Sequence, residues 1–177
     1  DIYQPGPRLF LRAGLRLSAF QSGDANFAFL EPRVSMRYRL DEKWYARFGA
    51  SRMVQYLHQI SPTGINLPND LWIPSSGTVD PQRSQQIEAG IQFAPGEGWH
   101  VSLDAYYKQM SHLYLLPGSF DRLRQIQETD IRKELLQGTG ISRGVDLMVE
   151  KKGKRTGGWL SYTLSKATRQ FLSLIHI

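Results

Sequence analysis

The chain has 177 residues, of which 41% are hydrophobic and 21% are charged, and its formal net charge is +6 at pH 7. This length is enough for one domain, and no run of about 18 apolar residues is present, which excludes a transmembrane helix. The absence of cysteine excludes disulfides, thiolate zinc sites and cysteine nucleophiles. The basic residues are interleaved along the chain rather than clustered, so nucleic acid is not an expected partner.

Strict alternation of apolar and other residues is the main pattern in the chain, and it predicts half-buried β-strands. The first run starts at Leu9 and places an apolar residue at every second position up to Ala19. Two residues depart from the pattern, because Arg52 is out of phase in the third run and Trp159 falls on the polar side of the last. The seven predicted strands have cores at residues 9–19, 34–40, 44–56, 87–93, 99–107, 145–149 and 160–164.

The connections between these strands alternate between short and long. Short turns rich in glycine or charge lie at residues 41–43, 95–98 and 152–155. A moderate loop is expected at residues 21–29, and very long ones at residues 59–81 and 114–137. In an up-and-down barrel this alternation puts all short turns at one end, as in outer-membrane barrels with short periplasmic turns and long extracellular loops.

The two faces of the predicted strands differ in the way a membrane barrel requires. Trp44, Phe93 and Trp99 flank the short turns, where an aromatic girdle is expected. The apolar face suits lipid, and the other face suits a wet or plugged lumen. The predicted fold is therefore all-β, an antiparallel up-and-down transmembrane β-barrel segment of about seven strands that is not closed. The residues expected to face the lumen are Arg33, Arg37, Arg39, Glu88, Asp104 and Lys108.

Two long loops have features of their own. Two prolines bracket residues 61–74, which predicts an ordered loop. In it, Asn69, Asp70 and Trp72 are the candidates for ligand contact, with the alternative that Leu71 and Trp72 anchor the loop.

Residues 120–136 of the other long loop mix apolar and charged side chains in a way that allows a short helix. Ser119 is its possible N-cap, and Gly138 lies near its expected end.

No catalytic or metal site is expected. His58, His100 and His112 lack the close spacing of a ligand pair. Glu88 and Asp104 read better as lumen carboxylates balanced by basic residues than as a catalytic pair. Residues 140–144 match the G-x-S-x-G pattern around Ser142, but a nucleophile elbow needs a helix after the strand, and here another strand is expected. No cofactor is expected.

An ordered set of segments resembles the C-terminal barrel region of TonB-dependent outer-membrane receptors, in particular the type with a carboxypeptidase-regulatory-like domain. Family members more often have Glu where this chain has Asp104 and Asp146. The segments that carry the resemblance are LEPR (30–33), QYLH (55–58), LPNDLWIP (67–74), DAYYKQM (104–110), GTGISRGVD (138–146) and WLSYTLSKATRQF (159–171).

The resemblance implies a barrel of about 22 strands with a plugged lumen in the bacterial outer membrane, importing metal chelates, cobalamin or glycans. The implied partners are membrane lipid, the plug domain, the remaining barrel strands, and TonB through an N-terminal part. A passive channel or small complete barrel is the second hypothesis, opposed by an odd strand number. An outer-membrane barrel hydrolase is the third, and no Ser/His or Asp/His set supports it.

The ends of the chain carry two further expectations. The pattern is already running at Asp1, which predicts that residues 1–171 are part of a larger barrel. Residues 172–177, LSLIHI, match the translation of a common sequencing adapter, and we expect them to be non-native.

Overall fold

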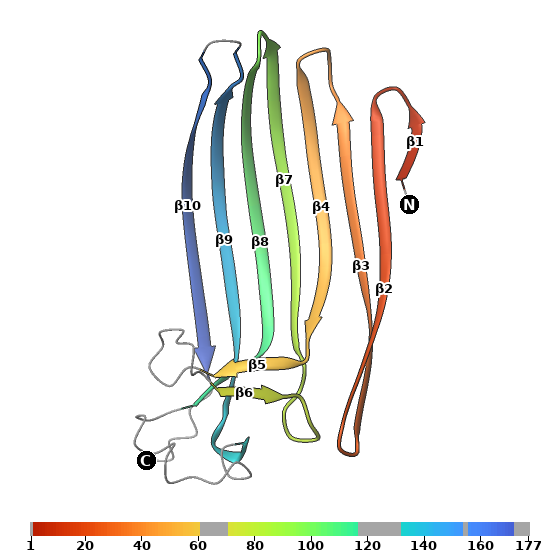
Figure 1. Cartoon of the computed structure of the whole chain (residues 1–177), viewed down its shortest axis with the longest axis vertical. Helices are drawn as coiled ribbons and strands as arrows, with labels where there is room; N and C mark the ends of the chain where they lie inside the picture. Colours follow the sequence, from red (N-terminus) through yellow and green to blue (C-terminus); the bar gives the residue numbers. More distant parts are fainter. Residues whose placement is uncertain (1, 61–70, 117–131, 154–155, 172–177) are drawn as a thin grey trace.

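The computed structural model describes residues 2–60, 71–116, 132–153 and 156–171. Eight strands form one antiparallel sheet in the order β1-β2-β3-β4-β7-β8-β9-β10 (Figure 1). No pairing closes β10 onto β1 within the described part of the chain. The predicted all-β, up-and-down, open sheet is confirmed. Its strands are β1 (Ile2–Gly6), β2 (Leu9–Ser22), β3 (Ala25–Arg39), β4 (Trp44–Gln55), β7 (Gln82–Gly96), β8 (Trp99–Leu115), β9 (Leu136–Lys151) and β10 (Gly158–Phe171).

The sheet has one strand more than the seven cores of the alternation, and the added strand is β1. Its five residues include a proline, and the alternation over them is too short to identify a strand. The odd strand number therefore no longer argues against a small complete barrel. The unpaired edges of β1 and β10 argue against a small complete barrel instead.

The short turns gather at one end of the sheet, the upper end in Figure 1. In the β3–β4 turn, the carboxylate of Asp41 accepts hydrogen bonds from the backbone N–H of Lys43 at 2.7 Å and of Trp44 at 2.8 Å. In the β7–β8 turn, Gly98 has φ +77°, and a Cβ there would run into the carbonyl of Lys152. The local chemistry of these turns thus fixes where each strand reverses.

The prediction of a moderate loop at residues 21–29 is wrong. The β2 and β3 strands pair continuously up to Ser22 and Ala25, and only Gly23 and Asp24 connect them. Beyond Ala19 the alternation inverts, because Phe20 falls in the polar phase and Gln21 in the apolar phase. The inversion looks like a strand end in the sequence although the backbone pairing continues.

The register sorts the side chains onto two faces, which we call the apolar face and the polar face. One row of direct cross-strand partners on the apolar face is Leu11, Met36, Phe48, Ala89, Ala105, Val145 and Leu164. The residues predicted to face the lumen share the polar face, and these are Arg33, Arg37, Arg39, Glu88, Asp104 and Lys108.

The β5 (Leu57–Ile60) and β6 (Leu71–Pro74) strands form a separate hairpin across the end of the sheet opposite the short turns (Figure 1). A small hydrophobic cluster of Ile60, Ile73 and Leu116 lies here, with Leu71 and Leu135 packed against it. The ordered loop predicted for residues 61–74 therefore contains a strand in its described part, and residues 61–70 lie outside the described residues.

The short helix expected at residues 120–136 falls mostly outside the described residues, as does its possible N-cap Ser119. Residues 132–134 form a single helical turn. The expected end near Gly138 is wrong, because β9 has already begun at Leu136 and Gly138 pairs with Leu113 on one side and Phe171 on the other.

Candidate functional site

The apolar face of the sheet is uncovered by any other part of the described chain. Leu15 is 68% exposed, Ile87 53% and Leu164 65%. Covering one such side chain stabilises a protein by about 1.5–3 kcal/mol, so a sheet with this many exposed apolar residues needs an apolar environment. The buried hydrophobic residues among those described are Ile60, Ile73, Val79, Leu113 and Leu116, all at the β5–β6 end.

The boundary of the apolar face crosses the strands obliquely. Counted away from the short turns, the last apolar residue of this face is Ala19 on β2 and Leu164 on β10. The β2 residue in the same cross-strand row as Leu164 is Leu11, not Ala19. The boundary thus shifts by eight residues over the six strand-to-strand steps between β2 and β10. On β7, between them, it falls after Ile87, two residues beyond the same row.

This oblique boundary gives the strand tilt. Eight residues at about 3.3 Å are about 26 Å along the strands, and six steps at about 4.8 Å are about 29 Å across them. A flat membrane boundary then requires the strands to tilt by about 40°, inside the range of about 35–45° of outer-membrane barrels.

Aromatic residues edge the apolar face at the short-turn end. The rings of Trp44 and Phe93 lie 4.5 Å apart between centroids. The Nζ of Lys151 lies 4.7 Å from the ring centre of Trp99. Tryptophan, with an apolar ring and one N–H group, suits the interface between hydrocarbon and headgroups, and so does a cation held over such a ring.

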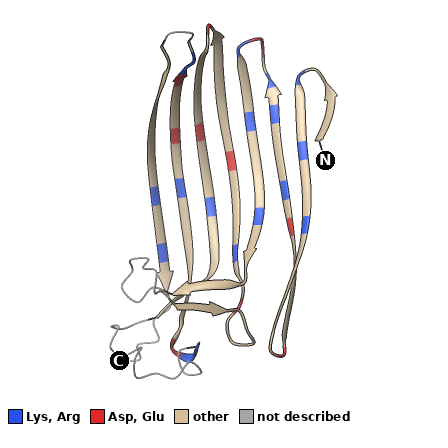
Figure 2. Ribbon diagram, in the orientation of Figure 1, with Lys and Arg blue, Asp and Glu red and all other residues tan. Residues whose placement is uncertain are grey.

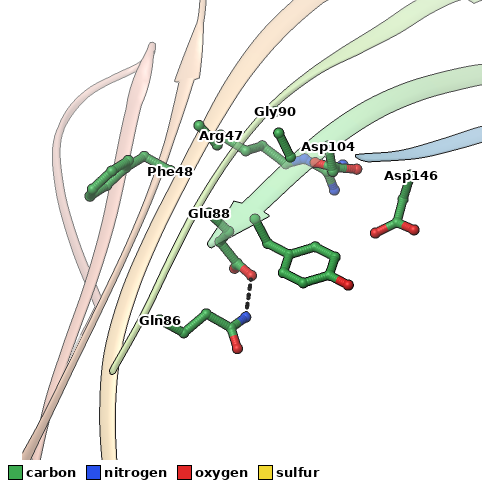
Figure 3. Close-up of a pocket in the computed structure, with 10 residues that line it drawn as sticks. Arg47, Phe48, Gln86, Glu88, Gly90, Asp104 and Asp146 are labelled. Atoms are coloured by element: carbon green, nitrogen blue, oxygen red, sulfur yellow. Dashed lines mark hydrogen bonds and ion pairs between the residues drawn. The ribbon is translucent and has the colours of Figure 1, made fainter. Parts of the chain in front are cut away.

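The polar face carries an ion pair that spans three strands. Arg47 on β4 reaches across β7 and donates from Nη2 to both carboxylate oxygens of Asp104 on β8, at 2.7 and 2.5 Å (Figure 3). The strand between them has Gly90 at this position, and a Cβ there would overlap the Asp104 carboxylate. The ion pair therefore exists because the intervening residue has no side chain.

The next row repeats this arrangement of large and small residues. The side chain of Glu88 covers Gly49, and the ring of Tyr106 covers Gly144. Glu88, Tyr106 and Asp146, together with the Arg47–Asp104 pair, line an open hollow of about 370 Å³ on the polar face (Figure 3). Asp146 is the direct cross-strand partner of Asp104 and accepts a hydrogen bond from Thr163 Oγ1 at 2.6 Å.

Figure 2 shows which strands carry charged residues, and the register adds which of these residues lie on the polar face. Basic residues dominate β2 and β3, with Arg12, Arg16, Arg33, Arg37 and Arg39 on this face. On the same face, β7, β8 and β9 carry four acidic residues, Glu88, Asp104, Asp146 and Glu150, and one lysine, Lys108. This division leaves a basic region and an acidic region, each suited to a partner of opposite charge.

Glu31 is the one acidic residue within the basic region, and its side chain is only 2% exposed. Its two carboxylate oxygens lie 3.8 Å from Arg16 Nε and 3.9 Å from Arg33 Nη2. A buried carboxylate needs such partners, and the alternation of the sequence alone does not distinguish Glu31 from its neighbours on this face.

The β5–β6 hairpin is held to β8 by a polar cluster around His58. The side chain of His58 is buried, its Nε2 lies 3.0 Å from Ser75 Oγ, and its ring packs edge-on against Tyr114. The hydroxyl oxygen of Tyr114 accepts a hydrogen bond from the backbone N–H of Asp80 at 2.7 Å. His112 Nε2 lies 3.6 Å from an Asp80 carboxylate oxygen.

Burial sets the protonation of this cluster. Desolvation lowers the pKa of His58 below its ordinary value of 6.5, opposed by a hydrogen bond with the Asp80 backbone and helped by the nearby His112. Burial also raises the pKa of Tyr114. Both groups are therefore neutral at neutral pH.

The candidate ligand residues are only partly described. Asn69 and Asp70 lie outside the described residues. Trp72 is 56% exposed on the face of the hairpin opposite the hydrophobic cluster, whereas Leu71 packs against that cluster. Leu71 anchors the hairpin and Trp72 does not.

The described residues contain neither a cluster of metal-ligating side chains nor a helix that could cross a membrane. No group of three or more His, Asp or Glu residues there is placed to hold a metal ion. No helix there is long and apolar enough to span a membrane. Ser142 lies within β9, between partners Lys108 and Ala167, without the strand-to-helix turn of a nucleophile elbow.

An open antiparallel sheet of long tilted strands, apolar on one face and charged on the other, defines the wall of a membrane β-barrel. The family model described as TonB dependent receptor-like, beta-barrel, matches residues 1–173, and the chain belongs to this family of receptors and transporters. Its members normally lie in the bacterial outer membrane. Searches of curated proteins and of solved structures found no match.

Gly90→Ala should destabilise the sheet, because the added methyl group displaces the Asp104 carboxylate from Arg47. We expect a loss of about 1–3 kcal/mol, as for other overpacked sites, measured as a lower temperature of heat-modified gel migration of the whole receptor. Gly14→Ala is the matched control, because a Cβ there meets nothing within 4 Å. Equal effects of the two substitutions would contradict the role of Gly90.

The packing of the β5–β6 hairpin should weaken in acid. The folded-state pKa of His58 lies below its unfolded value, so the unfolded form binds more protons and stability falls as the pH drops below 6.5. Proteolytic cleavage between β4 and β7 should accelerate from pH 7.5 to pH 5.5 in the whole receptor. His58→Gln should flatten this dependence, and His100→Gln, at the other end of the sheet, should leave it intact. An unchanged pH dependence in His58→Gln would reject the assignment.

Proposed function

We propose that this chain forms part of an outer-membrane receptor that imports a scarce, bulky nutrient with energy supplied through TonB. The nutrient class is a metal chelate, cobalamin or a glycan, as in the family type with a carboxypeptidase-regulatory-like domain. The observation that carries the proposal is the uncovered apolar face with its oblique boundary. Membership of a transporter family supports the same conclusion.

In this proposal the polar face lines a lumen filled by a plug domain. The basic region of β2 and β3 and the acidic region of β7 to β9 offer the plug two surfaces of opposite charge. Further barrel strands pair with the free edges of β1 and β10, since an unpaired edge is not tolerated in hydrocarbon. The short turns lie in the periplasm and the β5–β6 hairpin outside the cell.

Ligand contact is proposed for the outer face of that hairpin. Trp72 presents an exposed ring there, opposite Gln59 on the neighbouring strand, and Asn69 and Asp70 precede it in the chain. Exposed aromatic and polar groups on an outward loop are suited to holding a sugar or a chelate.

A passive channel and a barrel hydrolase are the other two hypotheses. The cross-strand network of Arg47 and Asp104 belongs to a wall that packs against other protein as readily as to one that lines water, so it does not favour a channel. Ser142 in the middle of a strand gives no support to a hydrolase.

Single cysteines in the whole receptor test the proposed facing and function together. Fluorophores attached to cysteines at Ile87, Ile91 and Leu103 should be quenched by lipids that carry a quencher. Fluorophores attached at Gln86 and Asp104 should not be quenched. Nutrient uptake by cells should stop when TonB is deleted, while the receptor remains in the membrane. Quenching at Gln86 or Asp104 would overturn the facing, and uptake independent of TonB would favour the passive channel.

A further inference from the structure

The seam between β3 and β4 is paired over only part of its length. In the described strands, pairing between these two stops at Arg33 and Ser51. Both strands continue with their other neighbours, since β3 stays paired with β2 up to Ala25 and β4 stays paired with β7 up to Gln55. The end of the β2–β3 hairpin, residues 18–29, extends past the end of β4 in Figure 1, and we call it the outer hairpin.

A proline marks the point where the pairing stops. Pro32 is the first residue of β3 beyond the paired part, and it has no backbone N–H to donate to a ladder. The pairing of β3 with β2 passes Pro32 without a shift of register, so the side of β3 that becomes an edge is the side toward β4. Arg52, the next residue of β4 after Ser51, stands at the edge of the apolar face. The seam therefore begins at about the level where hydrocarbon gives way to headgroups and water.

Side chains from the rest of the sheet reach across the unpaired part of the seam. The hydroxyl of Tyr56 donates to the backbone carbonyl of Ser18 at 3.2 Å and lies 2.7 Å from the Ser18 hydroxyl. The ring of Tyr56 stacks on Phe20 with 5.0 Å between centroids, and its centroid lies 6.4 Å from that of Phe29. The guanidinium carbon of Arg83 on β7 lies 4.5 Å from the centre of the Phe29 ring. Aromatic and polar contacts thus take the place of a ladder here.

Tyr56 itself is anchored on the sheet side of the seam. It follows β4 directly, and its backbone carbonyl accepts a hydrogen bond from the backbone N–H of Ser75 at 2.7 Å. Ser75 is fully buried, and its hydroxyl lies 3.0 Å from His58 Nε2 in the polar cluster of the β5–β6 hairpin. The ring of Tyr56 therefore projects from a fixed point, and the outer hairpin is the part that is free to move against it.

Buried polar atoms beside the seam oppose its closure. Glu31 Oε1 on β3 and Arg83 Nε on β7 are buried and have no hydrogen-bond partner among the described residues. An unpaired buried polar atom is costly, and water that enters an opened seam pairs it. The closed position of the outer hairpin thus depends on the side-chain contacts of Tyr56 and Arg83 rather than on backbone pairing.

We propose that the outer hairpin is a flap that turns about residues 30–32 and their partners 15–17, and that Tyr56 is the latch that holds the flap closed. Hinges are a few residues that absorb a change of backbone angle, and a segment held by few contacts opens most easily. The residues that Tyr56 holds, Ser18 and Phe20, share the phase of the polar face. Turning the flap outward therefore widens the loop-side mouth of that face. The inference rests on the proposed function only in assigning the polar face to a lumen.

Distances between pairs of spin labels, measured by pulsed electron paramagnetic resonance in the whole receptor, test the flap. One label is placed at Asp24, in the turn of the outer hairpin, and the other at the exposed Gln109 on β8. The control pair has its first label at Lys43, in the β3–β4 turn at the paired end of the seam. Both pairs are measured in the unaltered receptor, in Tyr56→Phe and Tyr56→Ala, and in the matched control Tyr45→Phe, which removes a hydroxyl from the paired part of β4.

Loss of the Tyr56 hydroxyl should raise the ratio of open to closed flap about fivefold, as expected for one hydrogen bond. Tyr56→Ala, which also removes the stack on Phe20, should raise it further. The Asp24 distances should accordingly gain a second population in the Tyr56 variants and stay unchanged in Tyr45→Phe, while the Lys43 distances stay narrow throughout.

Three results would overturn the proposal. The first is an Asp24 distribution that is the same in both Tyr56 variants as in the unaltered receptor, whether it is narrow or broad. The second is an equal change in Tyr45→Phe. The third is an equal change of the Lys43 distances, because the whole sheet would then be disturbed. Uptake that is independent of TonB counts against the proposed function and is read separately from these distances.

Discussion

Backbone hydrogen bonding is the constraint on which the rest of this structure depends. In hydrocarbon an unpaired backbone N–H or C=O costs several kcal/mol. The strand pairs β2–β3, β4–β7 and β9–β10 avoid this cost because their pairing runs along its whole length without a bulge. Continuous pairing fixes the register, and the register decides which face each side chain occupies. The apolar face, its oblique boundary and the charged network opposite are consequences of that single requirement.

The two faces then solve different electrostatic problems. The polar face concentrates carboxylates and guanidinium groups, and it accommodates them by leaving glycine where a neighbour must pass, as Gly90 does for Arg47 and Asp104. The apolar face excludes carboxylates altogether in the described strands and admits cations only near its edges, such as Arg143 and Lys166. Sorting by charge thus accompanies sorting by polarity in the described strands.

The sequence alone identified the parts of the strands whose apolar residues alternate regularly. Alternation located the central part of every long strand, because one face must be apolar wherever hydrocarbon touches it. The ends of the β2–β3 hairpin were missed because the alternation inverts there, with Phe20 stacked on Tyr56 at 5.0 Å rather than facing lipid. The β5–β6 hairpin was missed because its strands have four residues each and owe their order to a local cluster around Ile60 and Ile73.

The arrangement of the polar face could be predicted from the sequence only in part, because alternation gives the face of a residue but not its partner. Parity along the strands assigned Arg33, Glu88 and Asp104 to one face. Parity does not reveal the partnership of Arg47 with Asp104, because it joins residues 57 positions apart across an intervening glycine. Arg52, which looked out of phase in the sequence, keeps the regular register of β4 and stands at the edge of the apolar face.

Depth in the bilayer tests the central claim, that the apolar face is a lipid surface crossed by strands tilted at about 40°. Fluorophores attached to single cysteines at Leu11, Ala19 and Leu164 of the whole receptor are quenched by lipids labelled at different depths along the acyl chain. We predict that Ala19 and Leu164 lie at the same depth, near the loop-side headgroups, and that Leu11 lies much deeper although it shares the cross-strand row of Leu164. Equal depths for Leu11 and Leu164 would contradict the tilt, and no lipid quenching at any of the three would contradict the lipid surface itself.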